Sequence, residues 1–329
     1  MRILSASDVR KSLPMLATIE AMKKAYASYS DGQAIIPLRT AIPIKSQEAT
    51  SLFMPAYVHD PKVDDALAIK IVSLFPKNPA HNLDFIQAVV LVLDPLNGKT
   101  IALLEGSTLT AIRTGAASGA ATDLLARPDS RVATIFGAGT QGRTQLEAIC
   151  SVREIETVWI VDPDPQRAKN FVDDMTGTAP IPADIRITRD PKEALSSTDI
   201  ICTATTSTSP VYQTADVQPG THINGVGSYT LAMIENPPDL LANTTIFIDS
   251  LDAILAEAGE IVAAINKKEI FPAELTELGD LILGNASGRK YPKEITFFKS
   301  VGIAVQDAMA AQLALKNAEA MNLGQEVEF

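Results

Sequence analysis

The chain has 329 residues, of which 46% are hydrophobic and 20% are charged, and its formal net charge at pH 7 is −11. This length suits about two domains with cores of their own, and the composition is that of a globular protein rather than a disordered or fibrous one. An acidic surface repels phosphate groups, which argues against a nucleic-acid binder or a protein held to anionic membranes. The two cysteines, Cys150 and Cys202, are too few for a zinc cluster or a disulfide framework.

The apolar runs of the chain favour a cytoplasmic protein. A membrane helix needs about 18 uncharged apolar residues, and the best stretches are interrupted by charged side chains. The first eleven residues include Arg2, Asp8, Arg10 and Lys11, so they lack the apolar centre of a signal peptide. We therefore expect no contact with a membrane.

The first part of the chain predicts helices followed by a small antiparallel sheet. In the first forty residues, apolar side chains recur at helical spacings of three and four. Aliphatic and β-branched residues then predict strands over 67–75, 86–93 and 100–105, with a turn at 94–98. A helix over 107–126 follows, and its small residues on one face permit close packing.

After residue 128, predicted strands alternate with helical or turn segments. The strands lie at 131–136, 157–162, 184–188, 199–205, 221–227, 245–249 and 295–300. One long helix is then predicted over 301–321. Strands that alternate with helices pair in parallel, so this part of the chain predicts a doubly wound α/β sheet.

A glycine motif follows the first of these strands and opens a helix, as in a dinucleotide-binding unit. Gly137 permits a tight turn, Gly139 permits close approach of a pyrophosphate, and Gly142 permits close packing of helix and strand. The amide groups at the helix N-terminus then favour phosphate. The alternative is a tight glycine turn without a ligand.

The next strand ends at Asp162, which lies 25 residues after Gly137, close to the usual spacing of the acid that binds the adenosine ribose. A carboxylate at this position accepts hydrogen bonds from ribose hydroxyls and repels a 2′-phosphate. The sequence therefore favours NAD(H) as cofactor and leaves NADP(H) open. The alternative for Asp162 is the cap of a helix.

Six segments, taken in chain order, form a wider pattern: PLRT (37–40), AIK (68–70), LTAIRTGAASGAAT (109–122), FGAGTQG (136–142), HINGVGS (222–228) and FFKSVGIAVQD (297–307). Together they resemble the ornithine cyclodeaminase/mu-crystallin family, which includes an archaeal-type alanine dehydrogenase and bacterial ketimine reductases. The resemblance implies a Rossmann domain over 119–301, inserted into a smaller α+β substrate-binding and dimerisation domain formed by 1–118 and 302–329. It also implies a homodimer.

By this resemblance, Arg39, Lys70 and Arg113 surround a substrate carboxylate, and Val301 lies near the substrate. Guanidinium groups pair bidentately with carboxylates, so these residue types suit an imino or amino acid. If the side chain of Lys70 points inward, burial lowers its pKa and permits proton donation near neutral pH. The alternative is an edge-strand lysine that faces water.

The remaining positions taken over from the resemblance line the dinucleotide. Besides Arg113, the three glycines and Asp162, they are Thr114, Thr140, Gln141, Thr205, Val226, Gly227 and Ser300. No metal site is predicted, because the three histidines show no metal-ligand spacing and His222 suits a structural role.

One position departs from part of the family. Cyclodeaminases and the archaeal alanine dehydrogenase carry an Asp for proton transfer where this chain has Tyr229. A phenol with an unperturbed pKa of about 10 is a poor replacement for that carboxylate. The pattern is most similar to the bacterial ketimine reductases, which favours reduction of Δ1-pyrroline-2-carboxylate or Δ1-piperideine-2-carboxylate with NAD(P)H. The alternatives are an ornithine cyclodeaminase, an alanine-dehydrogenase-like enzyme and a dinucleotide-dependent binding protein without activity.

Overall fold

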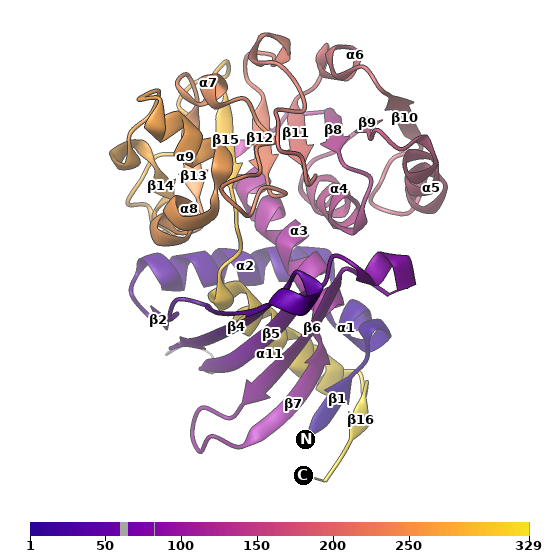
Figure 1. The fold of residues 1–329 in the computed structure, drawn as a ribbon, viewed down its shortest axis with the longest axis vertical. Coiled ribbons are helices and arrows are strands. Elements are labelled where there is room, and N and C mark those ends of the chain that lie inside the picture. The colour runs from indigo at the N-terminus through magenta and orange to yellow at the C-terminus, as the bar shows by residue number, and fades with distance from the viewer. Residues whose placement is uncertain (60–64, 82, 329) are drawn as a thin grey trace. The chain divides into compact units, whose positions relative to one another are not determined.

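The computed structural model describes residues 1–59, 65–81 and 83–328, which belong to two compact units (Figure 1). The first unit joins Met1–Arg113 with Ile303–Phe329, and the second unit is Thr114–Gly302. Both units share the helix α3 (Gly106–Leu125). The boundary between the units lies in α3, between Arg113 and Thr114, whereas it was expected after residue 118.

The first unit contains one eight-stranded sheet in the order β16-β1-β7-β6-β5-β4-β2, with β3 paired to β4. Its strands are β1 (Arg2–Leu4), β2 (Ala34–Ile35), β3 (Thr40–Ile44), β4 (Ala49–Val58), β5 (Ala66–Leu74), β6 (Ile86–Leu93), β7 (Thr100–Glu105) and β16 (Gln325–Glu326). Its other helices are α1 (Ala6–Ser12), α2 (Met15–Ser30) and α11 (Ala304–Ala320). Neighbouring strands are antiparallel except for β1 and β7.

The strands before residue 67 correct the expectation of a helical start followed directly by the sheet. β1 and β2 have three and two residues, and β3 and β4 contain Pro43 and Pro55, so local sequence preference for a strand is weak there. β4 is nonetheless paired with β5 from Thr50 to Val58. This non-local pairing, which single-sequence patterns do not register, forms the strand.

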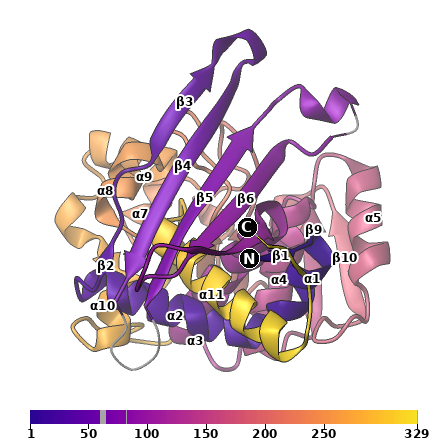
Figure 2. The same ribbon diagram turned by 90° about the horizontal axis from the view of Figure 1, so that it is seen from below.

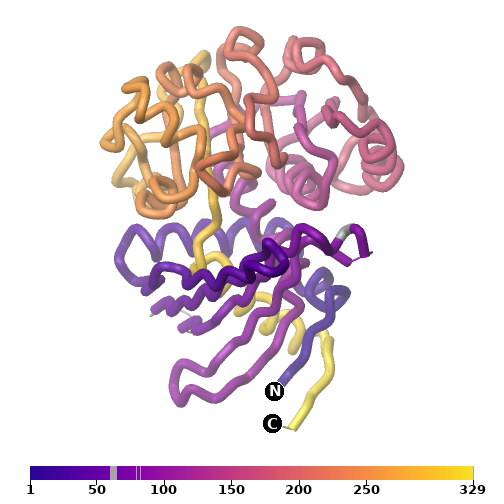
Figure 3. The backbone as a smooth tube through the Cα atoms, viewed as in Figure 1, coloured from indigo at the N-terminus to yellow at the C-terminus, as the bar shows by residue number. Residues whose placement is uncertain are grey.

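Alternate residues of β5 point to opposite faces of the sheet, as strand geometry requires. Ala66, Ala68, Lys70 and Val72 are buried, and the residues between them are partly exposed. Helix α11 packs on β4, β5 and β6 and against α2 (Figure 2). Figure 3 traces α11, in yellow, beside the indigo helices from the start of the chain. The chain thus returns at its end to cover the sheet that it began.

The second unit contains a parallel eight-stranded sheet in the order β10-β9-β8-β11-β12-β15-β13-β14. Its strands are β8 (Val132–Phe136), β9 (Thr157–Val161), β10 (Asp184–Thr188), β11 (Ile200–Thr203), β12 (His222–Gly225), β13 (Thr245–Ile248), β14 (Thr276–Glu277) and β15 (Thr296–Lys299). Its helices besides α3 are α4 (Thr140–Val152), α5 (Pro165–Met175), α6 (Pro191–Leu195), α7 (Pro238–Leu241), α8 (Leu251–Glu257), α9 (Gly259–Asn266) and α10 (Leu278–Leu283).

Both faces of this parallel sheet are buried. Ile201 belongs to one hydrophobic cluster, and its neighbours Ile200 and Cys202 belong to another. Consecutive strand residues point to opposite faces, so the two clusters lie on the two sides of the sheet. This confirms the predicted doubly wound α/β fold.

The order of the strands also locates a ligand crevice. The chain runs from β8 outward through β9 and β10, and then crosses to the other side of β8 to form β11. Ligands of such sheets bind at the carboxyl ends of the strands where this reversal occurs. Phe136 and Thr203 end the two strands, so the crevice is bordered by the glycine loop and by the loop after β11.

None of the helices formed by the described residues is long and apolar enough to cross a bilayer.

The last helix begins at Ala304, three residues later than expected, because Ser300, Val301 and Gly302 form a separate loop after β15.

Candidate active site

Lys70 lies on β5, on the face of the sheet that α11 covers, and only 2% of it is exposed. The alternative of an edge-strand lysine facing water is therefore wrong: β5 is an interior strand, paired with β4 and β6. An ammonium group in this position has lost its hydration and needs a partner of opposite charge.

That partner is Asp307 on α11, which the sequence analysis did not name as a site residue. Its Oδ2 lies 2.6 Å from Lys70 Nζ, and its Oδ1 accepts a hydrogen bond from Arg113 Nε at 3.0 Å. Asp307 is itself 1% exposed. One buried carboxylate thus joins the two cations. One indication of this role lay in the sequence, because Asp307 is the last residue of the FFKSVGIAVQD segment that carries the family resemblance.

Arg113 lies on α3 and is fixed by a second contact. Its Nη1 donates a hydrogen bond to Gln306 Oε1 at 2.6 Å, and this oxygen also accepts one from Ile303 N at 3.2 Å. Gln306 Nε2 in turn donates to the hydroxyl of Tyr26 on α2. The guanidinium is therefore held by side chains of α11, and α2 holds α11 at this point.

Arg39 is half-buried in the segment between β2 and β3. Its charge lowers the pKa of Lys70, so the predicted cations Arg39, Lys70 and Arg113 interact within the first unit. Lys70 and Arg113 share the carboxylate of Asp307, and the positive charge of Arg39 also acts on Lys70. Such a site suits an anionic ligand, above all a carboxylate.

The pKa of Lys70 is lowered to about 8. Burial is the main cause, and the charges of Arg113 and Arg39 act in the same direction, whereas Asp307 raises the pKa. A pKa close to the operating pH is what a general acid requires. Lys70 is therefore suited to donate and regain a proton near neutral pH.

In the second unit, the glycine loop has the close contacts that its sequence predicts. Gly137 has a φ of +98°, and a Cβ there would lie 2.5 Å from the carbonyl oxygen of Ala204. A Cβ on Gly142 would lie 2.1 Å from the carbonyl oxygen of Gly137. Both positions therefore admit only glycine.

The start of α4 is open in the way a dinucleotide phosphate requires. A Cβ on Gly139 would meet no described atom within 4 Å, and none of the described side chains caps the helix at this residue. Thr140 is exposed, and the buried Oε1 of Gln141 has no hydrogen-bond partner among the described residues. Uncapped amides at a helix N-terminus bind phosphate, so these residues fit the predicted group.

Asp162 lies directly beside this loop and is 3% exposed. Its Oδ2 accepts a hydrogen bond from Ala138 N at 2.8 Å, and its Oδ1 accepts one from Asp164 N at 2.9 Å. The alternative that Asp162 caps a helix is wrong, because the side chain that caps α5 belongs to Asp164. Asp162 instead connects the end of β9 to the glycine loop.

The other predicted cofactor residues of the second unit lie near the carboxyl ends of its strands. Thr205 follows β11, Val226 and Gly227 follow β12, and Ser300 follows β15. Val301, which was predicted to lie near the substrate, is the next residue after Ser300. Thr114 lies elsewhere, on α3, where its carbonyl oxygen accepts a hydrogen bond from Gln145.

Two buried carboxylates that the sequence analysis missed hold these loops. Asp249 Oδ2 accepts hydrogen bonds from Ser300 Oγ, Val301 N and Gly302 N at 2.8–2.9 Å. Glu235 accepts hydrogen bonds from the amides of Thr205 and Ser228. No local pattern marks either residue, because each acts on segments distant in sequence.

Tyr229 and His222 have different environments. Tyr229 is half-buried, and burial raises its pKa, so it is a neutral phenol at physiological pH. His222 is fully buried, with Nδ1 2.9 Å from Thr296 Oγ1, and burial lowers its pKa to about 3. No cluster of metal-ligating side chains occurs among the residues that the structure describes.

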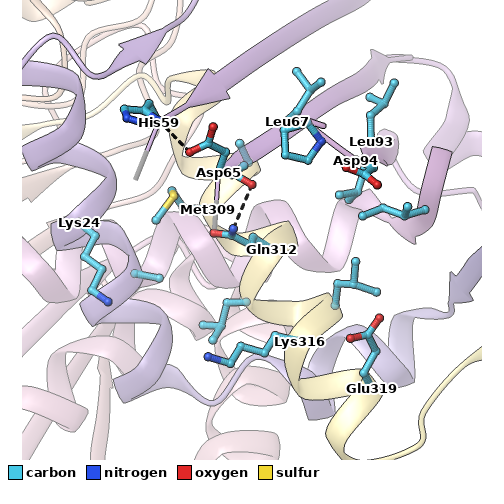
Figure 4. A pocket seen from close by; sticks show the side chains of 18 of the residues that line it. Lys24, His59, Asp65, Leu67, Leu93, Asp94, Met309, Gln312, Lys316 and Glu319 are labelled. Carbon is cyan, nitrogen blue, oxygen red and sulfur yellow. Dashed lines mark hydrogen bonds and ion pairs between the residues drawn. The ribbon is translucent and has the colours of Figure 1, made fainter. Parts of the chain in front are cut away.

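A pocket of about 760 Å³ lies in the first unit between α2, α11 and the sheet, and its lining includes Lys24, Leu67 and Lys316 (Figure 4). His59 and Asp65 also line it, with His59 Nδ1 at hydrogen-bond distance, 2.9 Å, from Asp65 Oδ1. None of the predicted site residues, all of which the structure describes, lines this pocket. It is therefore separate from the group around Lys70.

Comparison with known proteins places the chain in one family. The model of the ornithine cyclodeaminase/mu-crystallin family matches residues 1–322. A Δ1-pyrroline-2-carboxylate reductase of Bacillus cereus is 36% identical, and the match covers all of both chains.

Two solved structures match closely. That of Thermococcus litoralis Δ1-pyrroline-2-carboxylate reductase in complex with NADH and L-proline has a TM-score of 0.93 and 39% identity, covering 99% of this chain and 100% of that one. An archaeal alanine dehydrogenase dimer with bound NAD has a TM-score of 0.91 and 30% identity, covering 100% and 99%. The chain belongs to the ornithine cyclodeaminase/mu-crystallin family.

Proposed function

We propose that the chain is an NADH-dependent reductase of a cyclic ketimine carboxylate, with Δ1-pyrroline-2-carboxylate as the first substrate to test and Δ1-piperideine-2-carboxylate as the second. The observation that carries the proposal is the group of Arg39, Lys70, Arg113 and Asp307, in which a proton donor with a pKa of about 8 adjoins two guanidinium groups. The high similarity to a reductase solved with NADH and L-proline supports it.

In this proposal Arg39 and Arg113 bind the substrate carboxylate. Arg113 is suited to this role because Gln306 and Asp307 fix two of its nitrogens. A guanidinium that is already oriented loses less side-chain entropy when the substrate binds. The carboxylate then orients the imine for reaction.

Lys70 acts on the imine nitrogen. The protonated Lys70 Nζ donates a hydrogen bond or its proton to this nitrogen, directly or through water, which makes the neighbouring carbon electrophilic. When bound, the dinucleotide supplies the hydride that this carbon accepts. One proton and one hydride thus convert the C=N bond into CH–NH. Asp307 holds Lys70 in place and helps to keep it protonated.

The cofactor is bound by the glycine loop, the start of α4 and Asp162, with Thr114, Thr205, Val226, Gly227 and Ser300 as further contacts. Two features support NADH over NADPH. The turn after β9 carries the carboxylates of Asp162 and Asp164. The nearby Arg143 is paired with Asp174 at 2.6 Å and lies over the ring of Phe171. An added 2′-phosphate would therefore meet two carboxylates at this turn, partly offset by the exposed Arg167, whose guanidinium lies 4.0 Å from Asp162 and 3.9 Å from Asp164.

Tyr229 supports reduction over cyclodeamination of ornithine. Its phenol is neutral, and it cannot provide the carboxylate that the family resemblance assigns to this position in cyclodeaminases and in the archaeal alanine dehydrogenase. A neutral phenol also lacks the charge that would anchor a free side-chain ammonium.

The proposal includes a homodimer that covers the free face of the first sheet. On this face Pro55, Ile69, Leu91 and Leu103 form one row across β4 to β7, and all four remain partly exposed in the single chain. An apolar row of this kind is typical of a surface that a partner covers. A related archaeal alanine dehydrogenase was solved as a dimer.

The test is NADH oxidation by the purified protein with a panel of substrates. We expect turnover with Δ1-pyrroline-2-carboxylate or Δ1-piperideine-2-carboxylate, and no proline or ammonia from ornithine without added reductant. Absence of turnover with both imines would refute the proposal. Robust proline formation from ornithine would identify a cyclodeaminase instead.

A further inference from the structure

Glu235 is buried in the second unit, in the segment between β12 and α7, and has no exposed surface. Its two carboxylate oxygens accept hydrogen bonds from two different loops. Oε1 accepts from Thr205 N, in the loop after β11, at 2.5 Å. Oε2 accepts from Ser228 N, in the loop after β12, at 2.7 Å. One side chain therefore joins the carboxyl ends of two adjacent strands.

The two loops have little freedom to move apart or closer. The backbone amides of Val226 and Gly227 donate to the carbonyl oxygen of Thr203 at 3.0 and 3.2 Å. A Cβ on Gly227 would lie 2.2 Å from the carbonyl oxygen of Thr205 and 2.5 Å from Glu235 Oε1. The loops and the carboxylate are thus packed in direct contact.

The same contact reaches the glycine loop. A Cβ on Gly137 would lie 2.5 Å from the carbonyl oxygen of Ala204. The next residue, Thr205, is the one whose amide donates a hydrogen bond to Glu235. The loops after β8, β11 and β12 therefore meet at the crevice that the strand order identifies.

A carboxylate buried in this way is held by the donors around it. Lys299 pairs with Glu260 at 3.0 Å, and its charge also acts on Glu235. Burial raises the pKa of Glu235, whereas the charge of Lys299 and the hydrogen bonds at Thr205 lower it. If either loop moved away, this buried carboxylate would lose a hydrogen-bond donor, and the cost of that loss keeps the loops in one arrangement.

We propose that Glu235 is a positioning residue that fixes the loops after β11 and β12 in the arrangement that binds NADH. It acts through Thr205 and through the backbone of Val226–Ser228 and does not contact the substrate. The inference rests on the proposed function, which assigns Thr205, Val226 and Gly227 to the cofactor.

The test replaces Glu235 by Gln, which has almost the same volume but only one acceptor oxygen. Its NH2 group would face one of the two amide donors, so one loop loses its partner and shifts. We expect the dissociation constant of NADH, measured by fluorescence titration, to rise about tenfold, which corresponds to about 1.4 kcal/mol. The KM of the imine at saturating NADH should stay within about twofold.

Glu294→Gln is the matched control. Glu294 is also buried and accepts hydrogen bonds from the hydroxyl of Thr245 and the amide of Lys290. Thr245 is the first residue of β13, so this contact lies at the amino end of the strand, whereas the loops held by Glu235 follow the carboxyl ends of β11 and β12. The variant Glu294→Gln should lower the thermal unfolding midpoint of the protein without changing its affinity for NADH. A general loss of stability would affect both variants alike, whereas positioning changes NADH affinity only in Glu235→Gln.

Hydrogen exchange gives a second readout that does not depend on turnover. Peptides that contain Thr205 and Ser228 should exchange faster in Glu235→Gln than in the wild type, and at the wild-type rate in Glu294→Gln. An unchanged NADH affinity together with unchanged exchange in Glu235→Gln would overturn this proposal alone. A wild-type protein that binds no NADH would overturn the proposed function and this inference together. A wild type that binds NADH but reduces no imine would overturn only the reaction.

Discussion

Asp307 determines the chemistry of Lys70 at the scale of single residues. Burial and two arginines lower the pKa of Lys70 to about 8, and Asp307 is the group that opposes them. Without this carboxylate the ammonium would be buried beside a second cation and would lose its proton at a lower pH. The ion pair therefore keeps the proton donor charged in the neutral range.

Asp307→Asn should move the pH profile of the reductase. In the wild type we expect kcat/KM for the imine to fall as the pH rises through about 8, because deprotonated Lys70 cannot donate. In Asp307→Asn the falling limb should begin at a lower pH, since the charge that raises the pKa is absent. Glu319→Gln, an exposed carboxylate on the same helix, should keep the wild-type profile. An identical profile in Asp307→Asn would contradict this role.

Asp162 allows a test of cofactor choice. Asp162→Asn removes the charge but keeps an oxygen that can accept the hydrogen bond from Ala138 N. We expect NADH affinity to fall about tenfold, through loss of a charge-assisted hydrogen bond to the ribose, and NADPH affinity to stay equal or improve. The comparison of both dissociation constants on the same variant is the measurement. An equal loss for both cofactors would mean that Asp162 only holds the glycine loop.

The residues of the site were predictable to different degrees. Arg39, Lys70 and Arg113 lie in short motifs, and the glycines lie between a strand and a helix, so a resemblance and a local pattern identify them. Asp307 ends one of these motifs, but its pairing with Lys70 is not visible in the sequence. Glu235 and Asp249 lack any such signal, because each becomes a partner only when segments distant in the chain pack together. Hydrogen bonds of this kind follow from the tertiary fold.

At the scale of elements, seven of the eight strands of the parallel sheet were predicted, whereas the two-residue β14 and the first strands of the other sheet were not. β11, β12 and β15 are fully buried, and β8 is buried except for Val132. β8 and β11 also read as short apolar runs. β3 is largely exposed, and β4 carries Pro55 within the row of side chains on the free face of the sheet. These strands depend on pairing with β5 rather than on their own composition.

The free face of the first sheet gives a prediction at this scale. Leu91→Asp places a charge in the centre of the row formed with Pro55, Ile69 and Leu103. Burial of an unpaired carboxylate in an interface is unfavourable, so the variant should dissociate into monomers of about 35.1 kDa. Light scattering after gel filtration measures the mass.

Ile187→Asp is the control for this experiment. Ile187 lies on β10 of the other sheet and is already 44% exposed, so a charge there should leave the mass unchanged. A wild type that is monomeric at micromolar concentration, or a dimeric Leu91→Asp, would contradict the proposed interface.

At the scale of the whole molecule, the two units carry different parts of the proposed chemistry. The group around Lys70 lies in Met1–Arg113 and Ile303–Phe329, and the loops assigned to the dinucleotide lie in Thr114–Gly302. The expectation of a dinucleotide-binding domain inserted into a substrate-binding domain came from the family resemblance. The boundary within α3 could not be read from the sequence, since the helix continues without a break across it.

Transfer of deuterium from the cofactor shows whether the imine carbon accepts the hydride. NADH that carries deuterium at the transferred position of the nicotinamide is incubated with the purified protein and Δ1-pyrroline-2-carboxylate, and the product is analysed by mass spectrometry. We expect proline with one deuterium at its α-carbon for each NADH consumed, because the imine carbon accepts the hydride. Absence of proline, or proline without deuterium at this carbon, would contradict the proposed reaction.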